Sequence, residues 1–245
     1  GLTLDELPSA PMSPEGSSYL SVLYNGMVHP FTIFPVKGVI WYQGEANVGR
    51  ARQYSLLFQS LIADWRKQWK QELPFYFVQL ANYLRSQEIQ PDSKWAALRE
   101  AQSDALSMEG TGMVSAIDLG VAHDIHPKNK QEVGRRLALL SLANTYQRGT
   151  YDVPAFLEYR ISGNKLILSF DCEVKTTTGE PKGFIIAGPD QVFYQATATI
   201  QGKEVILESP EVEIPIAARY GWADNPECNL YGTAGLPVAP FRTDK

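Results

Sequence analysis

Residues 36–43, VKGVIWYQ, decide the fold that the sequence predicts. Apolar, β-branched and aromatic residues follow one another here without the alternation of a half-exposed strand. Such a short run is typical of a strand that is buried on both faces. The polar sequence GEAN at 44–47 follows directly. A carboxylate and two amides at the end of a buried strand suggest a role outside the core.

Two more strand-like runs follow, PFYFVQLA at 74–81 and TGMVSAIDL at 111–119. Helices are expected between and after them. The first has an apolar face that runs from Tyr54 to Trp69, the second covers about residues 94–108, and the third begins at Pro127, because a proline suits a first helical turn. The apolar residues that share one face of the first helix are Tyr54, Leu57, Phe58, Leu61, Ile62, Trp65 and Trp69. This alternation predicts a parallel sheet covered by helices on both faces.

Ligands of such sheets bind beyond the carboxyl ends of the strands. Two polar clusters lie at these positions: Gln43, Gly44 and Glu45 after the first strand, and His123, Asp124 and His126 after the third. We therefore expect both clusters on the same edge of the sheet.

The pattern changes after about residue 149, where five short β-rich runs are separated by turn residues. The sequences GNK at 163–165 and QGK at 201–203 are typical of hairpin tips. We expect a small antiparallel β domain, a sandwich, with an irregular stretch at its C-terminal end. The resulting division is an extended lead-in at 1–20, an α/β domain at 21–149 and a β-rich domain at 150–245.

Composition narrows the choice of partners. The 245 residues carry a net charge of −5 without a basic cluster, which argues against nucleic acid. No apolar run reaches the roughly 20 residues of a membrane span, and no signal peptide is visible at the N-terminus. Cys172 and Cys228 lack CxxC spacing, so a disulfide and two free thiols are both open. The cysteine pattern therefore leaves the cellular compartment of the protein undetermined.

The sequence D-x-H at 124–126 carries the strongest chemical signal. An aspartate beside a histidine holds one tautomer of the imidazole, so that the other ring nitrogen can act as a general base. A second interpretation makes Asp124 the cap of a helix that begins at Pro127. A third is a metal site formed by His123, His126 and Asp118. We expect neither a metal nor another cofactor.

The cluster after the first strand allows two interpretations. The Gln43 amide is a fixed donor that can face a developing oxyanion, and Gly44 permits close approach of a substrate. Glu45 can bind substrate hydroxyls or brace the loop, and Asn47 can cap the next helix. The alternative makes all four of them turn and cap residues. Asn25, in the polar sequence YNGM, is a further candidate for substrate binding.

Three blocks of sequence together resemble a known family. They are VLYNGMVHPFTIFPVKGVIWYQGEAN at 22–47, DIHPKNKQEVGRRLA at 124–138 and RYGWADNPECNLYGTAGLPVAPFRTD at 219–244. In this order they resemble the sialate O-acetylesterases, carbohydrate esterases of the SGNH (GDSL-like) hydrolase superfamily. The resemblance implies a flavodoxin-like three-layer α/β/α domain with accessory β domains. It also suggests a periplasmic, secreted or lysosomal location.

The resemblance assigns roles to these residues. It implies that His126 is the base, that Asp124 orients it, and that Gln43 lines the oxyanion hole with Gly44 and Glu45 beside it. The reaction that it implies removes an acetyl ester from sialic acid or a similar O-acetylated glycan through an acyl-enzyme, without a cofactor.

The chain departs from the family at the nucleophile. The family's serine lies in a Gly-rich turn upstream of the YNGM sequence, and Ser17 and Ser18 in EGSSYL match it poorly. We therefore expect an α/β domain that is incomplete at its N-terminal side, with the serine either carried by another polypeptide or lost from the gene. The alternative is a non-catalytic module that binds glycans through exposed aromatic residues, namely Tyr220, Trp222 and Tyr231.

Overall fold

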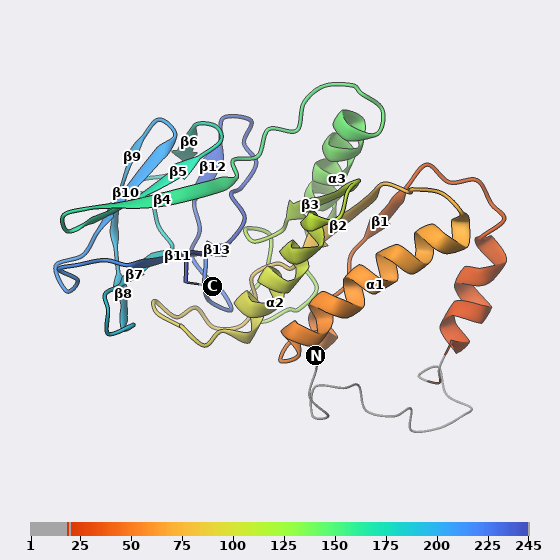
Figure 1. Ribbon diagram of the computed structural model, residues 1–245, viewed down its shortest axis with the longest axis horizontal. Helices are drawn as coiled ribbons and strands as arrows, with labels where there is room; N and C mark the ends of the chain where they lie inside the picture. The colour runs from red at the N-terminus through yellow and green to blue at the C-terminus, as the bar shows by residue number, and fades with distance from the viewer. Residues whose placement is uncertain (1–18, 20, 245) are drawn as a thin grey trace.

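The computed structural model describes residue 19 and residues 21–244, so the lead-in with Ser17 and Ser18 lies outside the described residues. Figure 1 shows an α/β part and a β part side by side. The elements of the α/β part are η2 (Tyr24–Val28), η3 (His29–Phe31), β1 (Val39–Trp41), η4 (Glu45–Asn47), α1 (Ala51–Trp69), β2 (Phe75–Gln79), α2 (Lys94–Ser103), η5 (Asp104–Ser107), β3 (Thr111–Ser115) and α3 (Lys130–Asn144).

The first three strands form a parallel sheet in the order β1-β2-β3, as the sequence predicts. All five residues of β2 are buried. Phe75 and Phe77 pack against α1 and α2, whereas Tyr76 and Val78 pack against α3. The sheet is therefore the middle layer of three, with two helices on one face and one on the other.

Two local predictions are wrong. The first strand is only three residues long, and its Ile40 side chain is 68% exposed, because in the described chain β1 pairs with β2 alone. The third helix begins at Lys130, and the Asn129 side chain caps it by accepting a hydrogen bond from the Glu132 N–H at 3.1 Å. Asp124 is therefore not the cap of this helix.

The β part contains ten strands in the described chain: β4 (Phe156–Ser162), β5 (Lys165–Phe170), β6 (Val174–Thr176), β7 (Phe184–Ala187), β8 (Phe193–Gln195), β9 (Thr197–Gln201), β10 (Glu204–Glu208), β11 (Ala217–Tyr220), β12 (Leu230–Gly232) and β13 (Phe241–Arg242). They form antiparallel sheets of order β4-β5-β10-β9 and β13-β11-β7-β8, and a β12-β6 pair. Residues from both four-stranded sheets share one apolar core, as in a sandwich.

The hairpin tips lie where they are expected, since Ser162 pairs with Lys165 and Gln201 pairs with Glu204. The C-terminal stretch is more regular than predicted, because it supplies β11, β12 and β13. Tyr220 and Trp222 are only 0% and 7% exposed, so the prediction of exposed aromatic residues there is wrong.

A fully buried arginine joins the two parts. The Arg99 guanidinium donates to the carbonyl oxygens of Leu80 and Ala81 in the α/β part, and of Ala223 and Asp224 in the β part. Burial lowers the pKa of Arg99 to about 10, so the group is still charged at neutral pH. The Asp224 carbonyl also accepts the Tyr83 N–H at 3.1 Å, whereas Arg99 supplies the donor that the buried carbonyls of Leu80, Ala81 and Ala223 require.

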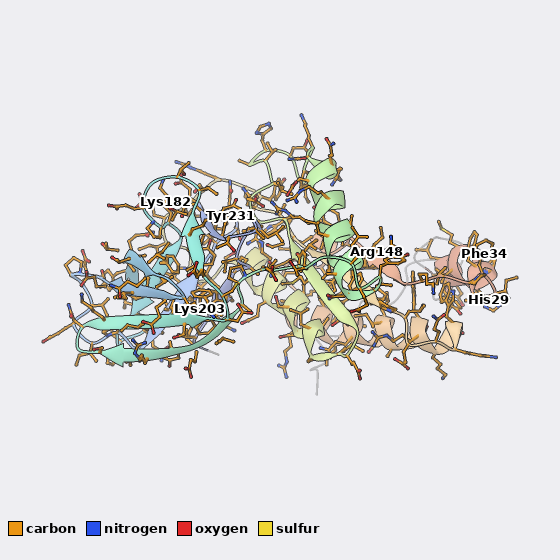
Figure 2. All side chains as sticks on the ribbon, turned by 90° about the horizontal axis from the view of Figure 1, so that it is seen from above. His29, Phe34, Arg148, Lys182, Lys203 and Tyr231 are labelled. Carbon is orange, nitrogen blue, oxygen red and sulfur yellow. The ribbon has the colours of Figure 1, made fainter. Side chains whose placement is uncertain are left out.

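The N-terminal arm, residues 21–38, differs from this buried junction because many of its apolar side chains are exposed. Its exposed apolar side chains are Val22, Leu23, Met27, Phe31, Ile33 and Phe34. The Trp69 indole N–H donates to the Phe34 carbonyl at 3.2 Å, which places the arm at the C-terminal end of α1. Figure 2 shows His29 and Phe34 at one end of the molecule and Lys182 and Lys203 at the other.

Cys172 and Cys228 are free thiols, and burial raises the pKa of Cys228 to about 12. None of the helices among the described residues has the length and apolar character that a bilayer crossing requires.

Candidate active site

The loop after β1 presents the Gln43 side-chain amide. Its NH₂ group donates one hydrogen bond to the Asn47 side-chain oxygen at 2.8 Å, and its second N–H remains available for a ligand. The Gln43 carbonyl accepts bonds from the Tyr54 hydroxyl at 3.1 Å and the Gln102 amide at 3.2 Å. Gln43 is therefore held by hydrogen bonds to both its main-chain carbonyl and its side-chain amide.

Gly44 is required by close packing behind this amide. A Cβ atom at this position would lie 3.1 Å from the Gln102 amide nitrogen and 3.3 Å from a Leu80 methyl. Asn47 does not cap α1, whose N-cap is Arg50; its side chain orients Gln43 instead.

Glu45 begins η4 and is half-buried, and no described residue forms a hydrogen bond or ion pair with its carboxylate. Burial, together with the charge of Glu45, raises the pKa of Tyr42 to about 12. The Tyr42 hydroxyl is buried and has no partner among the described residues. A free carboxylate and a neutral phenol therefore lie beside Gln43.

The loop after β3 carries Asp124 and His126. The His126 backbone N–H donates to Asp124 Oδ1 at 2.9 Å, and this bond lowers the pKa of the Asp124 carboxyl. The imidazole Nδ1 lies 3.6 Å from the same oxygen, which is within ion-pair range but longer than a hydrogen bond. The His126 side chain is 84% exposed. Nδ1 thus faces the carboxylate and leaves Nε2 free.

A buried ion pair anchors this loop. Arg136, whose side chain is 3% exposed, binds both Asp118 oxygens at 2.7 Å, and it also donates to the Ser115 carbonyl and to Glu132. The Tyr231 hydroxyl, from the β part, donates to Asp118 at 2.9 Å. One guanidinium therefore ties the end of β3 to the first turn of α3, with a contact from the other part.

The loops after β2 and β3 also support each other. The Gly120 N–H donates to the Asn82 side chain at 2.7 Å, and the Leu84 N–H donates to the Ala122 carbonyl at 3.1 Å. A Cβ atom on residue 120 would lie 1.8 Å from the Asn82 carbonyl, so only glycine fits where these backbones cross.

Contacts also link the loops after β1 and β3. The Lys130 ammonium lies 4.6 Å from the centre of the Tyr42 ring. Ile125 and Tyr42 pack against the same apolar cluster, which includes Tyr54. Asn25 is not part of this group: it is exposed on the N-terminal arm, at the other end of α1.

Comparison with known proteins now adds to this geometry. The family of carbohydrate esterases described as sialic acid-specific acetylesterases matches residues 14–143, more than half of the chain. The chain belongs to this family.

Individual relatives of this chain support the same family. The sialate O-acetylesterases of Mus musculus and Rattus norvegicus are 31% and 32% identical to it over 257 residues, with 92% of this chain and 48% and 47% of those proteins covered. A solved carbohydrate acetylesterase from Xanthomonas citri has a TM-score of 0.89 at 43% identity, over 95% of this chain and 56% of that chain. The chain thus spans about half the length of its curated relatives.

The alternative of a metal site at His123, His126 and Asp118 receives no geometric support. Among the residues that the structure describes, no three His, Cys, Asp or Glu side chains are grouped to hold an ion. Asp118, one of the three expected ligands, instead binds Arg136 and Tyr231.

Sequence reasoning missed the residues that brace the candidate site. Gln102 supports Gln43 across 59 positions of the chain, and Tyr231 reaches Asp118 across 113. Arg136 did carry a local signal, since it lies four residues after Glu132 on α3 and the two side chains are 2.9 Å apart.

Proposed function

We propose that this chain is the base-carrying part of a carbohydrate O-acetylesterase that removes acetyl esters from sialic acid or similar O-acetylated glycans. The carrying observation is the pair formed by Asp124 and His126, on a loop whose neighbours contact the loop of Gln43. Family membership supports the reaction class. The braced Gln43 amide has the free N–H that an oxyanion hole requires.

The proposed reaction has two acyl-transfer steps. A serine hydroxyl attacks the acetyl carbonyl and gives its proton to Nε2 of His126, while Gln43 donates to the oxyanion. The intermediate then collapses, and the sugar oxygen leaves with the proton from His126. Water attacks the acetyl-serine and gives a proton to His126, which then passes it to the departing serine oxygen, so that acetate is released and the serine hydroxyl is restored.

In this proposal Asp124 stabilises the imidazolium that forms in each step, because its carboxylate faces Nδ1 at 3.6 Å. The carboxylate of Glu45 has no described partner, so it is placed to accept hydrogen bonds from sugar hydroxyls beside the ester.

The serine is proposed to come from outside residues 19–245, on a polypeptide that completes a flavodoxin-like SGNH domain at its N-terminal side. The free edge of β1 and the exposed apolar residues of the N-terminal arm support such a contact. The division into domains at 21–149 and 150–245 is part of this proposal.

The test combines this chain with a second polypeptide that is expected to supply the nucleophile. The complement is the portion of the Xanthomonas citri esterase that this chain does not match, and the assay is acetate release from an aryl acetate and from O-acetylated sialic acid. We expect His126→Ala to lower kcat of the complemented protein at least about 1,000-fold.

His123 provides a matched control, because it is an exposed histidine of the same loop. His123→Ala should keep kcat within about twofold. Equal rates in the wild type and His126→Ala would show that His126 is not the base.

A further inference from the structure

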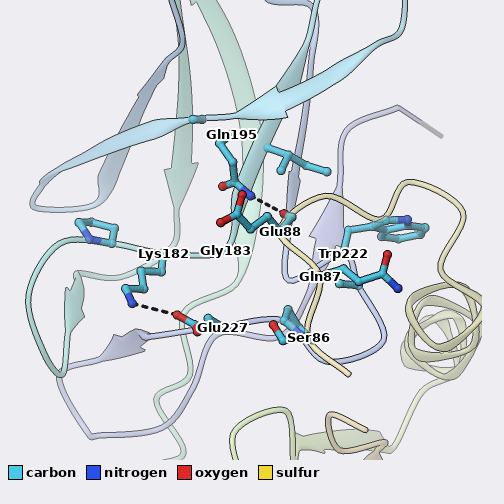
Figure 3. A pocket seen from close by; sticks show the side chains of 13 residues that line it. Ser86, Gln87, Glu88, Lys182, Gly183, Gln195, Trp222 and Glu227 are labelled. Carbon is cyan, nitrogen blue, oxygen red and sulfur yellow. Dashed lines mark hydrogen bonds and ion pairs between the residues drawn. The ribbon is translucent and has the colours of Figure 1, made fainter. Parts of the chain in front are cut away.

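A pocket lies between the two parts of the molecule, away from the candidate active site, with a volume of about 360 Å³. The loop after β2 supplies Ser86, Gln87 and Glu88, and the β part supplies the opposite wall with Lys182, Gln195 and Glu227. Figure 3 shows the Lys182–Glu227 ion pair and the contact of Gln195 with Glu88 around this space. Its size falls in the range of about 300–1,000 Å³ that is typical of small-molecule sites.

The walls of this junction pocket are held in place without a ligand. The Gln195 amide donates to the Glu88 carbonyl, and the Trp222 indole N–H donates to the Pro91 carbonyl at 2.8 Å. Both bonds tie the loop after β2 to the β part. A ligand would therefore meet a preformed cavity and would lose less affinity to ordering of the protein.

The surface of the pocket combines an apolar floor with a polar rim. Ile185, Trp222 and Pro226 are buried and form part of the floor. The side chains of Ser86 and Glu88 are exposed, and neither has a hydrogen-bond or ion-pair partner among the described residues. The rim thus offers a hydroxyl and a carboxylate that are not engaged elsewhere.

We propose that this junction pocket binds a neutral sugar unit of the glycan substrate. A pyranose ring has C–H groups that suit an apolar floor and hydroxyl groups that suit a polar rim. The Glu88 carboxylate can accept two hydroxyl hydrogen bonds in a charge-assisted pair.

The charge of the pocket lining favours neutral over anionic sugars. Glu88 and Glu227 are acidic, and the ammonium of Lys182 is already paired with Glu227 at 2.9 Å. One carboxylate remains without compensation, so the pocket disfavours an anionic sugar such as sialic acid itself.

The pocket is connected to the candidate active site through one loop. The Leu84 N–H bonds to the loop of Asp124 and His126, and Ser86 in the pocket is only two residues further along. A glycan whose acetylated unit lies at His126 can therefore place a neutral unit of the same molecule along this loop. The choice of a saccharide as ligand rests on the proposed function.

The experiment measures binding to the chain alone, so it does not depend on hydrolysis. Backbone amide NMR signals are followed while cellobiose, lactose, xylobiose or N-acetylneuraminic acid is added. We expect at least one neutral disaccharide to shift the signals of residues 86–88 and 182–183 saturably, and to bind at least fivefold more tightly than the acidic sugar. Glu88→Ala should weaken neutral-sugar binding about tenfold, since a charge-assisted contact is lost.

Two further variants sharpen the assignment. Glu88→Gln should narrow the preference for neutral sugar, because it removes the uncompensated charge. Gln201→Ala, which changes an exposed amide on β9 away from the pocket lining, should leave binding unchanged. No binding of any neutral disaccharide, tighter binding of the acidic sugar, or binding that Glu88→Ala does not weaken would overturn the proposal. Ester hydrolysis that depends on His126 would remain in each of these cases, so the two proposals fail separately.

Discussion

The two sides of the α/β part differ in how completely polar groups are hydrogen-bonded and apolar side chains are buried. On the side facing the β part, the fully buried Arg99 meets four carbonyl oxygens, and Asp118 meets Arg136 and Tyr231. On the β1 side, Ile40 is 68% exposed and Ile33 is 90% exposed. One side resembles a protein interior, and the other resembles an interface without its partner.

This difference bears on the candidate site, which lies between the two sides. The loop of Asp124 and His126 is anchored from the satisfied side through Arg136 and Asn82. The loop of Gln43 is braced by Gln102 from behind, but Tyr42 beside it keeps a buried hydroxyl without a described partner. In the proposed function this chain therefore supplies the base, and the nucleophile is proposed to approach from the open side.

The largest expected stability effect tests the satisfied side. Arg99→Met removes the side chain that bridges these four carbonyls and leaves the buried acceptors of Leu80, Ala81 and Ala223 without it. We expect the free energy of unfolding, measured by urea denaturation, to fall by about 3 kcal/mol or more. Arg148→Met, at an exposed arginine, is the matched control and should change it by less than about 0.5 kcal/mol. Similar effects of the two variants would show that the junction is not held by Arg99.

A smaller effect concerns the anchor of the His126 loop and depends on pH. Hydrogen bonds from Arg135, and then from Arg136, lower the pKa of Glu132 from 4.5 to about 2. A carboxyl whose pKa is lower in the folded state stabilises the protein above pH 4.5, and this contribution is lost as the pH falls toward 2.

Glu132→Gln should therefore lower the free energy of unfolding by about 1 to 2 kcal/mol at pH 7, a value reduced for partial exposure of the ion pairs. The gap between the wild type and the variant should shrink when urea denaturation is repeated from pH 5 down to pH 3. A gap of the same size at every pH would mean that the ion pairs of Glu132 do not contribute to stability.

The same contrast explains which features of the fold could be predicted from the sequence. The apolar runs at 74–79 and 39–41 look alike, yet β2 is buried throughout and Ile40 is exposed. An apolar pattern records which surface a chain is suited to bury, and it does not reveal whether the covering element belongs to the same chain. The parallel sheet was therefore predictable, and the exposure of β1 was not.

The residues in and around the candidate site also differ in whether a local sequence pattern reveals them. Asp124 and His126 were predicted as site residues because an acid–base pair is visible at a spacing of two residues, and Gln43 because it ends a strand; their roles stay predictions. Trp222 was misjudged, because a Gly- and Pro-rich stretch usually lies at the surface. In the structure Arg219 and Arg242 lie over its ring, and both belong to strands that pair in one sheet. Such burial arises from tertiary contacts that have no local pattern.

The smallest expected effect on stability tests the open side. Ile33 is 90% exposed on the N-terminal arm, so Ile33→Lys should change the free energy of unfolding by less than about 0.5 kcal/mol. The same variant should weaken complementation by the unmatched part of the Xanthomonas citri esterase at least about tenfold, because a lysine would be buried in the new contact. Titration of acetate release against the complement measures this.

Leu157→Lys is the matched control, since Leu157 is also an exposed apolar residue, at 62%, but lies on β4 in the other part of the molecule. It should alter neither stability nor complementation. If Ile33→Lys instead destabilised the isolated chain by more than 1 kcal/mol, the arm would already be packed in that chain, and the contrast between a finished and an open side would not hold. Equal complementation by both variants would place the partner elsewhere than on the arm, because a surface that buries Ile33 cannot accept a charged residue there without a loss of affinity.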